Sequence, residues 1–514
     1  MERETASSMI APNATPKPPS REWEIAETWT KFLFPFLFVD RSKPETFACG
    51  DQFAEALLHG SSAQQIWTET AFRPRELENM LPYVKQYLTW PSNHRRFEMT
   101  SDCLSGDAVF EFVIPAGKPA LAFRITEVVL HVFFNGVACL ALEVCPAGDL
   151  PLTIQEVESI NAHLASRANA TPFRLQQMLD AQTLSGFSIS KLCADRGQLT
   201  VPALIDTLLG TFYGRESEIL VQPMVDRFLP VYGAVLLRPL ERASIESLDE
   251  RFFEFAQHHL TILRKTFTPN NISTFSQIHL EDNSHHYMPY HNVIHSQSLD
   301  GGFILAYDNG LHHFSGPAAP AMESFRTSYF YMMLIPFHQR LSILRYTTAA
   351  ADAGLSPERG ADLRKLREEI YDFTSRCYFS QASVSEERNR IYERWQKEFH
   401  VVRMYNDLKE EVHDIDNYLA DLARQHENEL RDQAMRRDSR NMQLFALITL
   451  VFLPISVLLY AIPAIPIVGR WINFNLHPAR SAAIILGMAA FVAFMLIMMF
   501  RFVRRRRHTW LHDH

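Results

Sequence analysis

Two long apolar stretches near the end of the chain, residues 442–469 and 481–500, constrain its fold more than any other feature. Neither stretch contains a charged side chain. A bilayer core about 30 Å thick is crossed by about 20 apolar residues in an α-helix, and both stretches reach that length. The sequence therefore predicts a two-helix transmembrane domain over residues 441–503. The alternative is a pair of buried helices in a globular core, but such helices are usually shorter and carry a polar face.

Arginine residues flank these stretches unevenly. Three lie within residues 436–440 and five follow the second stretch, whereas the connecting loop 464–480 carries only Arg470 and Arg480. Because basic residues are retained on the cytoplasmic side, both termini are expected in the cytoplasm and the protein in the inner (plasma) membrane. Residues 504–514 would then form a basic cytoplasmic tail.

The composition fits a cytoplasmic body ahead of those helices. With a formal net charge of -8 the chain offers no basic domain for nucleic acid, and nucleic-acid binding is not expected. The six cysteines form no C-x-x-C pair, which is typical of thiols that stay reduced. Residues 1–22 are polar, lack the apolar run of a signal peptide and are expected to be a disordered tail.

Residues 23–316 mix strand and helix patterns. The clearest is a β-hairpin over residues 125–144, in which Asn135-Gly136 separates two apolar runs and both residues are expected to take positive φ. Further short strands are expected at 233–238 and 301–307, and helices at 154–170 and 245–265. Strands interleaved with helices predict an α+β domain with an antiparallel or mixed sheet.

Residues 317–440 read as a helical section that ends in a stalk. The pattern predicts a first helix over 322–351 with a kink at Pro336, and a second over 356–381. A third helix is expected to begin near Ser383 with Glu386 as its capping box, since no proline or glycine then occurs until residue 454.

Apolar residues recur along this stalk at three- and four-residue spacing, which indicates a packing seam. A long helix with one apolar stripe needs neighbours, so a homo-oligomer is expected. Beyond the seam the same phase meets polar residues, which fits either a fraying helix or a hydrated vestibule. The seam residues are Tyr405, Leu408, Val412, Ile415, Leu419 and Leu422.

The first apolar stretch carries a polar stripe. Met442, Thr449 and Ser456 stand one heptad apart, with Leu453 and Tyr460 close beside them on one side of the helix. Hydroxyl groups on a transmembrane face usually turn toward another helix or toward water. The stripe therefore predicts either the lining of a pore or a helix–helix contact.

The architecture of the chain resembles the CorA family of two-span divalent-cation channels and transporters. Locally, the segment 452–456, Phe-Leu-Pro-Ile-Ser, is similar to the family's Phe-x-Pro-apolar-Thr segment, with Ser in place of Thr. The resemblance implies a homopentamer in a lipid bilayer, with the first spans around the axis. It also implies that Met442, Thr449, Leu453 and Ser456 face the pore.

One departure from the family concerns selectivity. The family's Gly-Met-Asn signature is replaced by Pro-Ala-Ile at 463–465, and no Gly-x-Asn occurs in the loop. The loop has no acidic residue, and Arg470 and Arg480 would repel a divalent cation. Asn473 and Asn475 are the candidate substitutes, although turn or interface roles also fit them. Weak or altered magnesium selectivity is expected.

A second candidate site is the histidine-rich run 279–295. If it were helical, His291 and His295 would share one face and could ligate a divalent metal such as zinc. Pro289 and the neighbouring tyrosines favour an extended segment instead, and a solvated loop would accommodate the same histidines.

Two functional interpretations remain open. In the first, the protein is a CorA-like oligomeric ion channel or transporter. In the second, it is a membrane-anchored sensor or effector whose cytoplasmic domain binds a ligand or partner. An enzyme is not expected, because the sequence contains no phosphate-binding loop, nucleophile elbow, dinucleotide fingerprint or H-E-x-x-H motif.

Overall fold

The structure is a computed structural model. It describes residues 22–41, 50–59, 66–104, 107–114, 121–147, 152–176, 187–210, 218–240, 244–266, 285–315, 320–355 and 359–471, and scattered residues between 483 and 501. The chain divides into two compact units, Met1–Asp416 and Asn417–His514. The expected disordered tail 1–22 and basic tail 504–514 lie outside the described residues, apart from residue 22.

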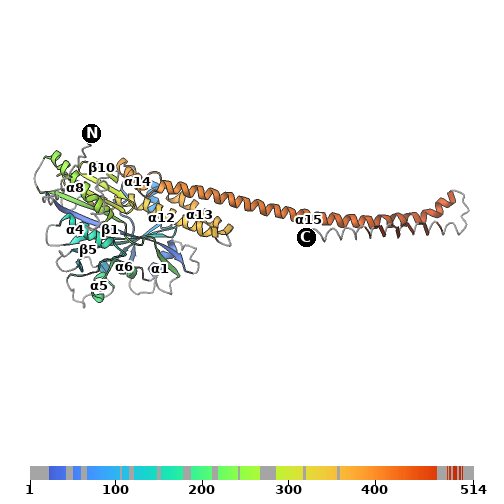
Figure 1. Cartoon of the computed structure of the whole chain (residues 1–514), viewed down its shortest axis with the longest axis horizontal. Coiled ribbons are helices and arrows are strands. Elements are labelled where there is room, and N and C mark those ends of the chain that lie inside the picture. The colour runs from blue at the N-terminus through green and yellow to red at the C-terminus, as the bar shows by residue number, and fades with distance from the viewer. Residues whose placement is uncertain are drawn as a thin grey trace, which may run out of the picture. The chain divides into compact units, whose positions relative to one another are not determined.

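A mixed sheet of 12 described strands forms the centre of the first unit (Figure 1). Its main path runs β10-β11-β12-β9-β1-β6-β5-β3-β2, with β4 and β7 continuing from β5 and with β8 beside β1. Of these pairings, β9 with β12 is parallel. The strands are β1 Trp23–Asp40, β2 Trp67–Glu69, β3 His94–Met99, β4 Phe110–Phe112, β5 Ala122–Phe133, β6 Val137–Ala147, β7 Phe173–Leu175, β8 Ile219–Pro223, β9 Val231–Pro239, β10 His286–Tyr290, β11 Val293–Ser298 and β12 Gly301–Tyr307.

The expected hairpin is confirmed as β5 and β6, which pair antiparallel from Ala122 with Ala147 to Val132 with Ala138. Its turn differs from the expectation. Only Gly136 has a positive φ, of 81°, and Asn135 does not. A single glycine in the left-handed region fits a longer turn rather than the two-residue type I′ turn. The strands expected at 233–238 and 301–307 are also present, as β9 and β12.

Both faces of the sheet are covered by helices of the first unit. Alternate residues of a strand point to opposite faces, and this separates two layers. On one face α1, α5 and α6 pack on the phenylalanines of β1, and α4 and α8 pack on β9, β11 and β12. On the other, α11 contacts β9, α12 contacts β6 and α14 contacts β11. The helices are α1 Gly50–His59, α2 Pro82–Thr89, α3 Ser101–Leu104, α4 Ile154–Ala165, α5 Ile189–Arg196, α6 Val201–Leu208, α8 Ile245–Lys265, α11 Pro320–Arg326, α12 Ser328–Leu355, α13 Arg359–Cys377, α14 Glu386–Glu398 and α15 Val401–Trp471.

The helical section is present, but the third helix does not begin or continue as expected. The N-cap residue of α14 is Ser385, and Ser383 instead donates a hydrogen bond to the backbone carbonyl of Asn79. The helical conformation is then interrupted at His400, whose φ is 55°, and α15 begins at the next residue. Absence of proline and glycine therefore did not guarantee one continuous helix, because a non-glycine residue can occupy the left-handed region at a helix end.

The predicted transmembrane domain is wrong. Within the part of the chain that the structure describes, no helix has both the length and the apolar character that a bilayer crossing needs. A bilayer crossing needs about 20 consecutive apolar residues in one helix. In α15 the apolar residues follow a long charged stretch of the same helix, and of 481–500 only scattered residues are described. The integral-membrane location, which followed from two spans, is corrected with it. The channel and ion-transport interpretation, which also assumed two spans, is left without support.

The seam of α15 is partly occupied by the chain itself. Leu408 is buried within the first unit, and Tyr405 stacks on Tyr378 with ring centroids 3.8 Å apart. Arg367 of α13 also donates a hydrogen bond to Asp416 at 3.0 Å. This first part of the seam packs against α13 rather than being free for copies of the chain.

Candidate functional site

Charged side chains lie on the sheet face that α11 and α12 cover. Along β1 the residues Phe32, Phe34 and Phe36 point into the apolar layer, so Lys31 points to the opposite face. The same alternation on β3, β5 and β6 places charged residues beside it. We call the resulting group the charged cluster; it consists of Lys31, Glu76, Arg96, Glu127, Glu143 and Arg326.

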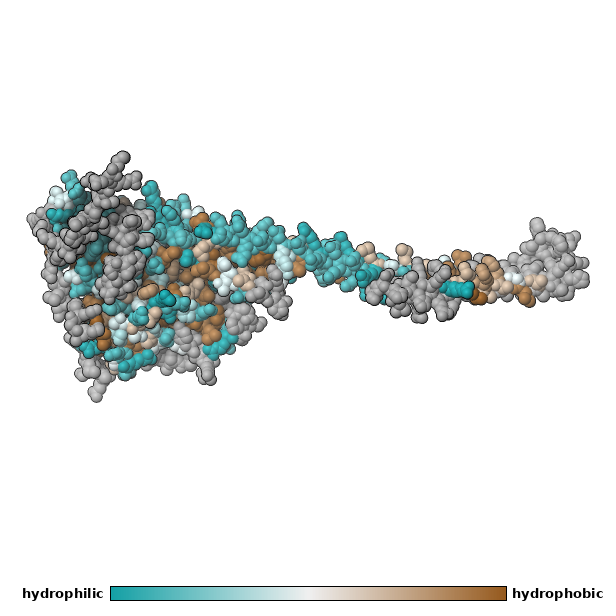
Figure 2. All heavy atoms as spheres, viewed as in Figure 1, coloured by the Kyte–Doolittle hydropathy of each residue, from teal (hydrophilic) through white to brown (hydrophobic). Residues whose placement is uncertain are grey.

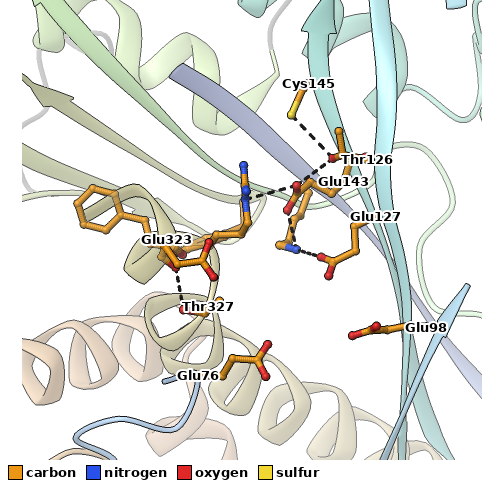
Figure 3. Close-up of polar contacts among 12 residues, drawn as sticks. Glu76, Glu98, Thr126, Glu127, Glu143, Cys145, Glu323 and Thr327 are labelled. Carbon is orange, nitrogen blue, oxygen red and sulfur yellow. Dashed lines mark hydrogen bonds and ion pairs between the residues drawn. The ribbon is translucent and has the colours of Figure 1, made fainter. Parts of the chain in front are cut away.

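Lys31 is the centre of the first half of the charged cluster, and Figure 3 shows its two partners, Glu127 and Glu143. Its Nζ lies 2.5 Å from Oε2 of Glu127 and 2.8 Å from Oε2 of Glu143. The side chains of Lys31 and Glu143 are only 5% and 3% exposed. Arg326 of α11 approaches Glu143 from the helical layer, with Nε 3.4 Å from Oε1. A buried ammonium group thus bridges two strands and is tied to the covering helix.

Arg96 forms the second half of the charged cluster. Its Nη1 donates to both carboxylate oxygens of Glu76, at 2.9 and 3.0 Å, and its Nη2 lies 2.5 Å from Glu98. Oε1 of Glu127 lies 3.8 Å from Nη2 of Arg96, so Glu127 connects the two halves of the charged cluster. The sequence neighbours Arg95 and Arg96 point to opposite faces, and Arg95 pairs with Glu69 on the other side of the strand.

The electrostatics of the charged cluster favour its ionised form. Burial acts to lower the pKa of Lys31, but Glu143 and Glu127 outweigh it and the pKa is raised. Burial acts to raise the pKa of Glu127, yet the ammonium of Lys31 and the guanidinium of Arg96 hold it below the usual value. The neighbouring His131 is neutral, because burial and nearby cations lower its pKa well below 6.5. The cluster is therefore a set of mutually dependent buried charges.

A cavity of about 220 Å³ lies beside the charged cluster, between the sheet and α11–α12. Figure 3 shows the four glutamates that line it, Glu76, Glu127, Glu143 and Glu323, extending from different elements. Arg73 and Glu323 add an exposed cation and an exposed carboxylate at its rim. We call it the charged cavity.

A larger pocket, of about 830 Å³, lies where the β10–β11 turn, the end of β12 and the start of α14 meet. We call it the aromatic pocket, because aromatic side chains form much of its wall. Its volume falls in the range of about 300–1,000 Å³ that is usual for sites of small organic ligands. The wall includes Asn79, Asp249, Tyr290, His291, Tyr307, Phe314, Phe325, Tyr329, Glu387 and Arg388.

Tyrosines hold the two carboxylates of the aromatic pocket. The hydroxyls of Tyr290 and Tyr329 donate to the two oxygens of Glu387, each at 2.6 Å, and Tyr307 donates to Asp249 at 2.5 Å. The hydrogen bond to Glu387 raises the pKa of Tyr290 to about 12, so its hydroxyl stays a donor. The carboxylates are thereby fixed in position while each oxygen keeps capacity to accept a further hydrogen bond.

Arg388, the guanidinium that lines the aromatic pocket, already has partners. The guanidinium of Arg388 lies 5.3 Å from the ring centroid of Tyr329, and it donates to the backbone carbonyl of Glu78 at 2.7 Å. The two carboxylates therefore face one cation that is held against the wall. Tyr290 is 52% exposed, so its ring can stack on a ligand while its hydroxyl stays bonded to Glu387. This arrangement suits an aromatic molecule that carries one positive charge.

The structure places the two candidate metal ligands apart. His291 lies in the turn after β10 and is 90% exposed, whereas His295 lies in β11 and is buried. Burial, with Arg394 nearby, lowers the pKa of His295 to about 3, and its ring stacks on Tyr329. The segment is a hairpin, so helical spacing does not apply. Among the described residues, no group of histidine, cysteine and acidic side chains could hold a metal ion.

The polar stripe residues lie on α15. The hydroxyls of Thr449 and Ser456 donate to the carbonyls of Phe445 and Phe452 at 2.8 and 2.6 Å, so the helix itself satisfies them. The other three stripe residues, Met442, Leu453 and Tyr460, are exposed. Asn473, Asn475 and Arg480 and the side chain of Arg470 lie outside the described residues.

Neither the charged cavity nor the aromatic pocket was found from the sequence. One signal was available: Lys31 is the single charge in a run of 12 residues, Thr28–Val39, that is otherwise uncharged, and a lone charge in a buried strand requires partners. The aromatic pocket gave no such signal, because Asn79, Asp249 and Glu387 are far apart in the chain.

Comparison with known proteins gives no relative of this chain: no protein-family model, no curated protein and no solved structure matches it. The resemblance to the CorA family therefore stays a prediction.

Proposed function

We propose that the first unit is a ligand-binding sensor module and that its aromatic pocket takes a small aromatic molecule with a protonated amine. The observation that carries this proposal is the pair of tyrosine-held carboxylates, Glu387 and Asp249, in a pocket walled by aromatic rings. An ammonium group would lie between the carboxylates, and the aromatic body would stack on Tyr290. Of the two interpretations from the sequence, this keeps ligand binding by the body and leaves out the membrane anchor.

The electrostatic balance supports a cation over an anion. Leaving aside the 90% exposed His291, whose Nδ1 lies 3.9 Å from Asp249 Oδ2, two carboxylates against one engaged guanidinium leave a deficit of one positive charge, which a protonated amine supplies. A ligand carboxylate would instead meet Glu387 and Asp249 at close range, and like charges in a partly desolvated site repel strongly. The exposed ring of Tyr290 adds cation–π attraction of about 0.5–2 kcal/mol.

Tryptamine is a suitable probe, and calorimetric titration of the whole protein tests the proposal. Replacing Glu387 by Gln is expected to weaken tryptamine binding about tenfold, because the charge is removed while the shape is kept. Replacing Tyr290 by Ala should weaken it as well, whereas Tyr290→Phe should retain most of the affinity since the ring remains. Unaltered affinity in both E387Q and Y290A would contradict the assignment.

The matched control lies on the same helix. Glu393 is exposed on α14, outside the pocket, and accepts a hydrogen bond from Asn389 that glutamine can also accept. Glu393→Gln should bind tryptamine as the unmodified protein does. Indole-3-propionate, with a carboxylate in place of the amine, should not bind, and equal binding of the two compounds would show that the carboxylates play no part.

We also propose that copies of the chain associate through the second unit. Between residues 442 and 460 the described residues of α15 include large exposed apolar side chains, such as Phe445 at 71% and Phe452 at 62%. Figure 2 shows apolar residues, in brown, along this part of the helix. Apolar patches of that extent on a protein surface mark association sites. A second copy of the chain carries the same apolar stretch, so a symmetric helix bundle would bury these side chains against one another.

Native mass measurement tests this association. The unmodified protein should give a multiple of the chain mass, and the resemblance to the CorA family sets five as the number to look for. Phe445→Glu combined with Phe452→Glu should lower the assembly to single chains, because buried carboxylates would oppose packing. Gln433→Glu, at an exposed polar position of the same helix, should leave the mass unchanged. A single chain in the unmodified protein would contradict the proposal.

A further inference from the structure

The charges that line the charged cavity cancel. Its wall holds four cations and four carboxylates, and the carboxylates are Glu76, Glu127, Glu143 and Glu323. The side chains of Lys31 and Arg96 are 5% exposed, and each is paired with two carboxylates or more. A ligand with a net charge would be buried beside these groups without an added counter-charge, which costs free energy. The cavity therefore favours an uncharged ligand.

Two guanidinium nitrogens in this wall lack a partner. Nε of Arg96 and Nε of Arg326 are buried and have no hydrogen-bond partner among the described residues. Glu143 lies 3.4 Å from Nε of Arg326, in an ion pair that does not have the geometry of a hydrogen bond. Buried polar atoms are rarely left unsatisfied in native proteins. Because both arginines line the cavity, an occupant with acceptor oxygens would satisfy them.

Other groups of the wall need an occupant that also donates. The carboxylate of Glu323 makes no ion pair with any described cation. The hydroxyl of Tyr331 makes no hydrogen bond with any described residue, although Tyr331 is only 3% exposed. An ammonium group can only donate and a carboxylate can only accept, whereas a hydroxyl group does both. The wall therefore matches a ligand rich in hydroxyl groups.

We propose that the charged cavity binds a small uncharged polyol of the sugar or cyclitol class. Ring hydroxyls would accept hydrogen bonds from Arg96 and Arg326 and donate one to Glu323. The C–H face of the ring would pack on Phe330, which also lines the cavity. The cavity volume of about 220 Å³ lies below the range of about 300–1,000 Å³ that is usual for drug-sized ligands, so a single ring suits it.

This site is separate from the aromatic pocket, and the two proposals can fail independently. Among the described residues, none lines both cavities. The aromatic pocket offers two carboxylates and an exposed tyrosine ring, which suit an aromatic amine. The charged cavity offers donors and acceptors with no net charge, which suit hydroxyl groups.

Calorimetric titration of the whole protein with myo-inositol tests the polyol site. We expect myo-inositol to bind at least about tenfold more tightly than cyclohexanol, which has the same carbon ring but a single hydroxyl group. Tyr331→Phe removes only the unpartnered hydroxyl and should weaken myo-inositol binding about three- to tenfold. Glu323→Ala should weaken it by a similar factor or more. Circular dichroism should show both variants folded, because Glu323 is exposed and the Tyr331 hydroxyl has no described partner to lose.

Tyr371→Phe and Glu254→Ala are the matched controls. Tyr371 is 78% exposed on α13, and Glu254 is exposed on α8, on the opposite face of the sheet. Both variants should bind myo-inositol as the unmodified protein does. Any of three results would overturn the proposal: no binding of myo-inositol, equal affinity for myo-inositol and cyclohexanol, or full affinity in both Y331F and E323A. Tighter binding of myo-inositol 1-phosphate than of myo-inositol would also overturn it, since the cavity would then select an anion.

Discussion

Replacing Lys31 by Met is expected to lower the free energy of unfolding by about 3–5 kcal/mol, because removing one partner leaves two buried carboxylates without their counter-charge. Lys31 is 5% exposed, and both Glu127 and Glu143 lie within 2.8 Å of its nitrogen. The loss would come from the stranded charges more than from the ion pairs themselves. Urea unfolding, followed by circular dichroism at neutral pH, measures it.

A double variant separates stranded charge from lost packing. Lys31→Met combined with Glu127→Gln should be less destabilised than the two single changes added together, by about 1–3 kcal/mol, because the second change removes one stranded carboxylate. Lys365→Met is the control, since Lys365 is 58% exposed and its carboxylate partner is 4.0 Å away. It should change stability by no more than about 0.5 kcal/mol. If the changes in the free energy of unfolding of the two single variants simply added up in the double variant, Lys31 and Glu127 would not be energetically coupled.

Acid is expected to destabilise the protein well before its carboxylates titrate. Burial lowers the pKa of His94 from 6.5 to about 4 and that of His295 from 6.5 to about 3. His131 and His338 are buried too, with pKa values well below 6.5. The unfolded chain would bind protons on these histidines as the pH falls below 6.5, while the folded chain would not. Folding stability is therefore present above pH 6.5 and is lost as the pH falls toward 4.

The size of the stability loss in acid follows from the pKa shifts of the buried histidines. One pKa unit corresponds to about 1.4 kcal/mol, so His295 alone accounts for roughly 3 kcal/mol between pH 6.5 and pH 4. His295→Phe keeps a ring against Tyr329 and should remove that part of the pH dependence. His291→Phe, at a 90% exposed position, should leave the dependence as it was. Urea unfolding across this pH range measures the free energy of unfolding. If that free energy changed equally with pH in H295F and in the unmodified protein, the assignment to His295 would be contradicted.

Local patterns in the sequence predicted much of the sheet. The β5–β6 hairpin, β9, β12 and α8 lie where alternation, the Asn-Gly pair and helical periodicity placed them. These elements are set by neighbours in the chain, so a local pattern carries the information. The break at His400 was not predictable in this way, because it depends on one residue in the left-handed region and not on proline or glycine.

The two candidate sites could not be derived from local patterns. Glu143 contributes to the charged cavity only because β6 pairs with β1 and brings it to Lys31, more than a hundred residues earlier. Glu387 meets Tyr290 only after α14 packs near the β10–β11 turn. The metal site predicted from the histidine run is absent from the described residues because its four-residue spacing would bring His291 and His295 together only on a helix. The segment is a hairpin, in which the two side chains lie apart.

The central claim is that the aromatic pocket is a ligand site, and a structure of the protein determined with bound tryptamine tests it most directly. We expect the ligand amine within hydrogen-bond distance of Glu387 or Asp249, and the indole ring against Tyr290. The tyrosine–carboxylate hydrogen bonds should persist, because each oxygen can accept more than one donor. Tryptamine bound elsewhere on the protein, with the aromatic pocket empty at saturation, would contradict the account.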